Sequence, residues 1–315
     1  MVRFLYEMVV CAKQKGLVLW PYLYKVNKAL VNLLYPVMQR LHSKVGTSER
    51  GEIIVSLTSF PGRIHQVWKT VASLLNQSLP PKKVILWLAS EQFPDKKLPN
   101  NLLRMTKRGL EICWCEDLKS HKKYYETFKQ FPDNIVVTAD DDIFYPENFL
   151  EKLWETHQIY PEAVICHWSH RIMMDEAGSF CPYNMWENNA KEQPAYATLA
   201  VGCNGVLYPP VKQILEAEEL LDADKIRKYA IKADDLWLKC MEILSEIKTI
   251  NCNSTPLIYF NNVTTRKTGL WVENTGEEKN NDIVWTRLMD EYPEVKNRLF
   301  REIRLQDSET SQSKP

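Results

Sequence analysis

Residues 135–142 read IVVTADDD, so three adjacent aspartates directly follow a short run of apolar and β-branched residues. Such a run is typical of a buried strand in a parallel sheet, and ligands of these sheets bind beyond the carboxyl ends of the strands. Adjacent carboxylates repel one another unless a cation compensates them, and Mg²⁺ or Mn²⁺ commonly joins one or two carboxylates to phosphate oxygens. The stretch therefore predicts a metal-diphosphate site at Asp140, Asp141 and Asp142 rather than a solvated acidic turn.

The chain on either side of this stretch alternates between short apolar runs and helical patterns. We expect strands at 53–57, 84–88, 110–115, 135–138 and 164–168, and on both sides of the glycine turn in 198–210. We expect helices at 64–77, 98–107, 124–131, 146–160 and 211–219, and one that begins at the acidic pair 234–235. This alternation predicts an α/β fold, a mostly parallel sheet flanked by helices. Loops 58–63, 90–91, 117–123 and 140–142 should then converge on one crevice.

The amino-acid composition limits the classes to which this protein can belong. The 315 residues are 45% hydrophobic and 25% charged, as in ordinary globular proteins, and the formal net charge is zero, which argues against a nucleic-acid partner. The eight cysteines form no C-x-x-C motif. Because no signal peptide precedes them, we expect reduced thiols in a cytoplasmic protein.

Residues 1–50 differ from the rest and predict a basic, amphipathic helical head followed by a linker. Residues 1–44 contain seven cationic side chains but only one carboxylate, Glu7. The longest uncharged stretches have nine and eleven residues, which is too short for a bilayer-spanning helix. A helix of this kind either lies on anionic lipid, here the cytoplasmic face of the inner membrane, or packs against the body or a partner.

Two further groups of residues could carry chemistry. Asp234 and Asp235 start a helix. A carboxylate there either caps the first turn or faces the crevice as a general base. The two roles are compatible, with Asp234 as the cap and Asp235 facing the crevice. Cations on the crevice loops could neutralise a diphosphate, with at most one of Lys122 and Lys123 in that role. His167 and His170 lack the spacing of a zinc site, so packing or substrate contact is expected of them.

Five segments, in order, resemble the GT-A glycosyltransferases, specifically the family 2-like enzymes that use nucleotide sugars to build bacterial surface polysaccharides. They read IIVSLTSFPGRI (53–64), VASLLNQSLPPKKVIL (71–86), DLKSHKKYYETFKQFPDNIVVTADDDIFYP (117–146), VGCNGVLYPP (201–210) and ADDLWLK (233–239). The resemblance implies a GT-A, Rossmann-like domain at 51–305, with a nucleotide-sugar half at about 51–146 and an acceptor half at about 147–305. A polar tail would follow at 306–315.

The resemblance also implies roles for particular residues. It places the nucleotide-binding loop at 58–63, the DxD-type metal carboxylates at 140–142 and the base in the acidic pair, usually its later member. The candidates for binding the nucleotide sugar lie on this loop and on the other crevice loops. They are Thr58, Phe60, Arg63, Glu91, Asp117, Lys119, Lys122 and Lys123. Relatives usually have an aspartate where this chain has Ser90-Glu91, and Ala139 stands at the leading position of their D-x-D-D register. The division of labour among the three aspartates therefore stays open.

The implied activity is a metal-dependent, inverting sugar transfer of the hexosyltransferase type, from a nucleotide-diphosphate donor to a glycan or lipid-linked acceptor. Bound Mn²⁺ or Mg²⁺ and nearby cations would stabilise the leaving diphosphate, while a carboxylate takes the proton of the acceptor hydroxyl. The departure at Ser90-Glu91 supports an alternative, a non-catalytic nucleotide- or carbohydrate-binding scaffold of a polysaccharide-assembly complex. A phosphatase with a D-x-D-x-Thr/Val motif is disfavoured because Phe144 holds its last position.

Overall fold

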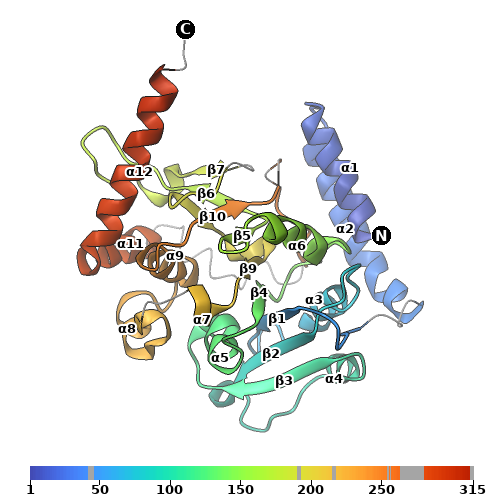
Figure 1. The fold of residues 1–315 in the computed structure, drawn as a ribbon. Helices are drawn as coiled ribbons and strands as arrows, with labels where there is room; N and C mark the ends of the chain where they lie inside the picture. The colour runs from blue at the N-terminus through green and yellow to red at the C-terminus, as the bar shows by residue number, and fades with distance from the viewer. Residues whose placement is uncertain are drawn as a thin grey trace.

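A seven-stranded sheet lies at the centre of the computed structural model, which describes residues 1–41, 46–189, 193–214, 218–253, 255, 257–262 and 280–312 (Figure 1). The strand order is β10-β5-β9-β4-β1-β2-β3, and β9 alone among these strands runs antiparallel to its neighbours. The strands are β1 (Ile53–Thr58), β2 (Lys83–Ala89), β3 (Leu110–Cys115), β4 (Ile135–Ala139), β5 (Val164–Cys166), β9 (Val206–Tyr208) and β10 (Thr249–Asn251). The predicted α/β class with a mostly parallel sheet is confirmed.

The register of the two central strands fixes the position of the acidic stretch. In β1, Ile53–Leu57 are fully buried, as expected for a strand covered on both faces. Ile53 pairs with Ile135 and Leu57 pairs with Ala139 in the parallel β1–β4 ladder. The residues that follow these strands therefore leave the sheet at the same edge.

Helices cover both faces of the sheet. Helix α5 packs against β1, β2 and β4, whereas α6 packs against β5. The helices are α3 (Val67–Leu74), α4 (Asn100–Thr106), α5 (Lys122–Gln130), α6 (Phe149–Ile159), α7 (Val211–Ile214), α8 (Ala223–Tyr229), α9 (Asp234–Leu244), α11 (Asn280–Glu291) and α12 (Pro293–Gln312). The helix expected at 64–77 is shorter because residues 61–66 form turns, and the one expected at 211–219 ends at Ile214, beyond which 215–217 lie outside the described residues.

A second, three-stranded sheet lies within residues 169–200. Its order is β7-β6-β8, with β6 (Ser169–Arg171) antiparallel to β7 (Glu187–Asn189) and to β8 (Thr198–Ala200). Residues 175–195, for which no strand was expected, thus contribute β7, although 190–192 lie outside the described residues. The expected tail at 306–315 begins inside α12, and its last three residues are not described either.

The N-terminal segment forms two helices, α1 (Val2–Gln14) and α2 (Trp20–Leu41), which pack on each other and on the body (Figure 1). Their inner side chains belong to the same apolar core as β1 and β4: Val2, Tyr6, Val9, Val31 and Tyr35. Within the described part of the chain, no helix combines the length and the apolar character needed to cross a membrane. Residues 42–45 of the expected linker lie outside the description.

One extended segment, 257–262, joins this helical pair to the loop after β4. On one side, the Tyr24 hydroxyl donates to the carbonyl of Tyr259 at 3.2 Å. On the other side, the amide of Asn262 donates to the carbonyl of Asp142 at 2.7 Å, and Ile143 forms a β-bridge with Asn261. The N-terminal helices are therefore tied through backbone contacts to the acidic loop.

Candidate active site

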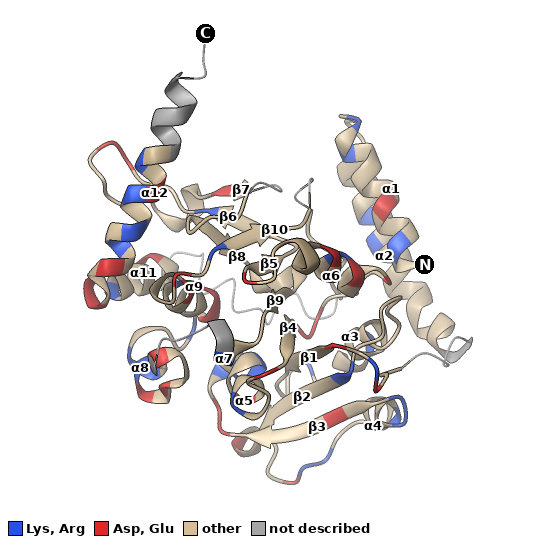
Figure 2. Ribbon diagram, in the orientation of Figure 1, with Lys and Arg blue, Asp and Glu red and all other residues tan. Residues whose placement is uncertain are grey.

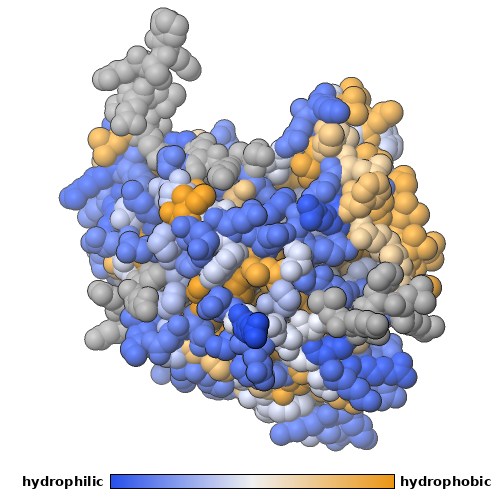
Figure 3. Space-filling model, turned by 45° about the vertical axis from the view of Figure 1, so that its right-hand side comes forward, coloured by the Kyte–Doolittle hydropathy of each residue, from blue (hydrophilic) through white to orange (hydrophobic). Residues whose placement is uncertain are grey.

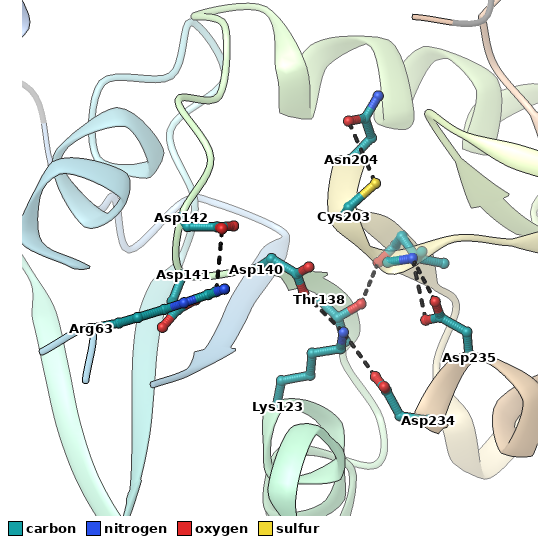
Figure 4. A network of polar contacts seen from close by, with 12 residues as sticks. Arg63, Lys123, Thr138, Asp140, Asp141, Asp142, Cys203, Asn204, Asp234 and Asp235 are labelled. Carbon is teal, nitrogen blue, oxygen red and sulfur yellow. Dashed lines mark hydrogen bonds and ion pairs between the residues drawn. The ribbon is translucent and has the colours of Figure 1, made fainter. Parts of the chain in front are cut away.

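The three aspartates lie at the carboxyl edge of β4, next to the loop that follows β1 (Figure 4). This edge is the usual ligand-binding side of an α/β sheet. The structure surrounds each aspartate differently, a distinction that three identical adjacent residues conceal in the sequence.

Asp141 points into the protein and is only 6% exposed. Its Oδ1 lies 2.6 Å from Nη1 of Arg63, and its Oδ2 accepts a hydrogen bond of 2.5 Å from Ser59. Thr70 donates to its backbone carbonyl. Burial raises the pKa of Asp141, and Arg63 and Ser59 act against this rise. Both carboxylate oxygens thus serve to hold the β1 loop against the β4 loop.

Asp140 and Asp142 are more accessible, with side chains 34% and 15% exposed. Asp142 Oδ2 lies 3.3 Å from Nη1 of Arg63, and Asp140 Oδ1 lies 3.0 Å from Nζ of Lys123. Burial alone would lower the pKa of Arg63, but Asp141 and Asp142 raise it overall. These two carboxylates offer oxygen atoms on the accessible side of the loop.

Lys123 connects the aspartates of the β4 loop to the acidic pair of α9 (Figure 4). Its ammonium lies 3.0 Å from Asp140 and 2.8 Å from Asp234, and its side chain is 6% exposed. Burial opposes its charge, but Asp140, Asp234 and Asp235 hold the pKa of Lys123 well above its usual value. Lys123 is thus a fixed cation between carboxylates from two different elements.

The members of the acidic pair have opposite electrostatic surroundings. Burial opposes ionisation of Asp234, but Lys123 and then His121 outweigh it and lower its pKa. For Asp235, burial and the neighbouring Asp234 charge raise the pKa to about 7, against the opposing effect of Lys123. The N-cap position of α9 is held by Ala233, so neither aspartate occupies it. Such a separation of two pKa values is typical of acid–base sites.

A glycine turn completes this part of the site. The amide of Gly202 lies 3.2 Å from both carboxylate oxygens of Asp235. A Cβ at this position would lie 2.8 Å from Nζ of Lys123 and 2.9 Å from Oδ1 of Asp235. Tyr145 ties the turn to the β4 loop, because its hydroxyl accepts from the Asp140 amide and donates to the Cys203 carbonyl. Only glycine leaves room for this approach.

Three of the predicted binding residues form a separate cluster after β3. Asp117 accepts from Lys119 at 2.8 Å and from Lys122 at 2.7 Å, and these contacts hold its pKa below the usual range although burial raises it. Gln92 also donates to Asp117, whereas Glu91 is exposed. Of the adjacent lysines, Lys123 contacts Asp140 and Lys122 faces Asp117.

The remaining candidates have supporting contacts. The Thr58 hydroxyl donates to the Trp87 carbonyl, and the guanidinium of Arg63 lies over the Phe60 ring with its Cζ 5.6 Å from the centroid. His167 is fully buried, contacts the Phe149 carbonyl, and has a pKa lowered to about 4 by burial. It packs in the core, as expected.

Sequence reasoning missed the residues that hold the acidic groups in place. Ser59 lies 82 positions from Asp141 and Tyr145 lies 58 positions from Cys203, and the sequence pattern does not predict these contacts. His121 is buried and bonds Tyr124 and the Ala230 carbonyl, while its pKa is lowered by burial. Ser59 had one signal, its place inside the loop already expected to bind nucleotide.

The sequence matches no protein-family profile, and no curated protein matches it. Among solved structures, S. aureus TarS residues 1–349 align over 76% of this chain and 71% of that one, with a TM-score of 0.42 and 14% identity. Mannosyltransferase PcManGT from Pyrobaculum calidifontis, described in complex with GDP-Man and Mn²⁺, aligns over 81% and 67%, with a TM-score of 0.38 and 11% identity.

A third structure, 4-diphosphocytidyl-2C-methyl-D-erythritol synthase, aligns over 57% of this chain and 85% of its own, with a TM-score of 0.35 and 8% identity. All three TM-scores lie below 0.5, so the function is inferred from the residues of the site.

Proposed function

We propose that the chain is a glycosyltransferase that moves a sugar from a nucleoside-diphosphate donor to an acceptor hydroxyl. The observation that carries this proposal is the charge cluster around Lys123. The Lys123 ammonium contacts both Asp140 and Asp234. Asp140 is close in sequence to Asp142 on the β4 loop, and Asp234 is adjacent to Asp235, whose pKa is raised. Diphosphate binding and proton removal, the two needs of sugar transfer, thus have neighbouring groups at one edge of the sheet.

The donor side of the site suits a hard divalent cation. Among the described residues, no group of three or more His, Cys, Asp or Glu side chains could hold a metal alone. Asp140 and Asp142 offer oxygen ligands, which fits Mg²⁺ or Mn²⁺ when donor phosphates complete the coordination. Such an ion would neutralise charge that develops on the leaving diphosphate. Asp141 keeps the loop in place through Arg63 and Ser59, and Lys123 adds a fixed positive charge.

On the acceptor side, the surroundings favour Asp235 as the base. A general base works best when its pKa lies near the operating pH, and the pKa of Asp235 is about 7. The Gly202 amide orients its carboxylate, while Asp234 stays ionised and holds Lys123. Tyr183 packs against His170 and Trp186, and an aromatic ring of this kind is suited to stacking on an acceptor sugar. Single attack with one base inverts the anomeric centre.

The test is donor turnover with a panel of nucleoside-diphosphate sugars, Mn²⁺ and a mixture of simple sugar acceptors. We expect EDTA-sensitive release of one nucleoside diphosphate, lowered about 100-fold or more by Asp142→Asn. Asp95→Asn removes a carboxylate that is 73% exposed and serves as the matched control. Metal-dependent nucleotide binding without turnover of any sugar would favour the scaffold alternative, and turnover unaffected by Asp142→Asn would contradict the proposed site.

A further inference from the structure

The outer face of α1 and α2 exposes a concentration of large apolar side chains (Figure 3). Of the eighteen large hydrophobic residues that are exposed in the described chain, eleven lie within residues 4–37. They are Phe4, Met8, Leu17, Val18, Leu19, Tyr22, Val26, Leu30, Leu33, Leu34 and Val37. Scattered single residues need no explanation, but a contiguous apolar surface of this kind marks an interaction site.

The spacing of these residues makes the surface continuous. Positions 22, 26, 30, 33 and 37 recur every three or four residues, so they follow one side of α2 along most of its length. On α1, Phe4 and Met8 are spaced in the same way, and the exposed Cys11 continues their line. The turn between the helices presents Leu17, Val18 and Leu19, which are 52%, 88% and 69% exposed. We call Leu17–Leu19 the tip of the hairpin.

Cations and aromatic rings surround the tip. Nζ of Lys13 lies 5.0 Å from the centroid of the Trp20 ring, and Nζ of Lys25 lies 5.8 Å from that of Tyr22. Lys15 is exposed beside them. The only carboxylate of residues 1–41, Glu7, is paired with Arg3. In Figure 2, basic positions predominate over acidic ones along α1 and α2. Amphipathic lysine and aromatic side chains next to exposed leucines are the pattern of a membrane interface.

We infer that the outer face of the α1–α2 hairpin docks peripherally on an anionic lipid bilayer, with the tip inserted among the headgroups. Charge selects this occupant, because two copies of the same cationic surface would repel each other whereas anionic headgroups attract it. Neither helix is long and apolar enough to span a bilayer. This inference does not depend on the proposed function.

Docking would also orient the candidate site. The inner face of the hairpin holds segment 257–262, for example through Tyr6, whose hydroxyl donates to the Leu257 carbonyl at 2.6 Å. The same segment bonds the carbonyl of Asp142 and, through Leu257 and Tyr259, both ends of the Asn204 amide group. The hairpin therefore holds the site at a fixed position relative to the membrane instead of tethering it loosely.

Flotation of the full-length chain with vesicles tests the inference. We expect binding to phosphatidylglycerol–phosphatidylethanolamine vesicles and much weaker binding to phosphatidylcholine vesicles. The triple variant Leu17→Ser, Val18→Ser, Leu19→Ser should weaken partitioning at least about tenfold. Lys15→Gln with Lys25→Gln should weaken it by about fivefold for each lysine and reduce its sensitivity to salt.

A matched control replaces exposed apolar residues elsewhere: Leu103→Ser, Ile159→Ser and Ile283→Ser, at sites 43%, 64% and 45% exposed. This variant should float as the wild type does, and circular dichroism should show all variants folded. Absence of binding to both vesicle types would overturn the inference, and so would unchanged binding of the tip variant. A dimer that the tip variant abolishes, without vesicle binding, would assign the face to self-association instead.

Discussion

At the residue scale, the buried ammonium of Lys123 neutralises carboxylates from two elements that are far apart in the sequence, Asp140 and Asp234. Taking charges out of water is costly, and their mutual attraction offsets this cost only when every member is present. Burial and the neighbouring charge of Asp234 raise the pKa of Asp235, and Lys123 offsets them only in part. Stability and basicity therefore come from one arrangement.

Asp235→Asn should lower kcat about 10²- to 10⁴-fold, the usual contribution of a general base. In the wild type, kcat/KM should rise with pH and level off above about pH 7, because only the ionised carboxylate accepts a proton. The variant should lack this rise. A wild-type profile that is flat between pH 5 and 9 would argue against Asp235 as the base.

The same variant should be more stable than the wild type. A carboxylate whose folded pKa lies above its unfolded value contributes stability below pH 4 that is lost as pH rises through about 7. The gain in Tm from Asp235→Asn should thus be larger near pH 8 than near pH 4.5. Asp234→Asn should lower Tm near pH 7, because the pKa of Asp234 is lowered in the folded state.

Lys123→Met should destabilise the protein by about 3–5 kcal/mol, the usual effect of leaving a buried charge unpaired. Adding Asp234→Asn removes one of the two unpaired carboxylates and should recover part of this loss. Urea unfolding of the four proteins in this double-mutant cycle measures the coupling free energy. Strict additivity would mean that the Lys123–Asp234 pair is not energetically coupled.

The residue scale is also where sequence reasoning reached its limit. The sequence does not distinguish the three adjacent aspartates from one another. In the structure, the path of the chain after Ala139 turns Asp141 inward to Arg63. Arg63 lies in the loop after β1, where the sequence placed it, whereas Lys123 was expected in a loop and lies in the first turn of α5. It left the choice between Asp234 and Asp235 open, since their difference comes from Lys123, more than a hundred positions away.

At the scale of elements, β1 to β4 were predicted to within a residue or two. β1, β2 and β4 are short apolar runs that the sheet buries, and β3 is a mostly apolar run at its edge. The small sheet was missed for the opposite reason. β6 and β7 consist of polar residues, Ser169–Arg171 and Glu187–Asn189, and their pairing depends on contacts between distant segments. Burial is visible in a local pattern, whereas long-range pairing of polar strands is not.

The glycine turn after β8 carries a prediction of its own. Gly202→Ala should lower activity by at least about tenfold and stability by about 1–3 kcal/mol, because its Cβ would contact both Lys123 and Asp235. Gly205→Ala is the comparison, since its φ is +87° and its Cβ would meet the Phe149 ring instead. We expect it to lose more stability than Gly202→Ala, because the Phe149 ring is fully buried and the positive φ strains alanine, but to keep the wild-type dependence of kcat/KM on pH. If Gly202→Ala kept the wild-type activity while Gly205→Ala altered the pH dependence of kcat/KM, the role assigned to Gly202 would be contradicted.

At the scale of the whole molecule, the N-terminal helices are part of the folded body as well as an exposed surface. Five of their side chains share the apolar core of the central sheet. Each contributes about 1.5–3 kcal/mol when fully buried, and the net stability of a folded protein is only about 5–15 kcal/mol. A boundary after residue 50, as the charge pattern suggests, therefore separates compositions rather than independent folding units.

Deletion of residues 1–41 should consequently abolish stable folding, because it uncovers the apolar residues around Tyr259 and Phe260 that pack against Tyr6. Thermal unfolding followed by circular dichroism should show a transition lowered by more than about 10 °C, or no cooperative transition. Deletion of residues 306–315 is the control and should leave the transition unchanged, since those residues follow Ile303, the last core side chain among those that the structure describes. A truncated chain that unfolds cooperatively at the wild-type Tm would instead show that the hairpin is a separate attachment, and the rigid link from hairpin to acidic loop would then have no energetic basis.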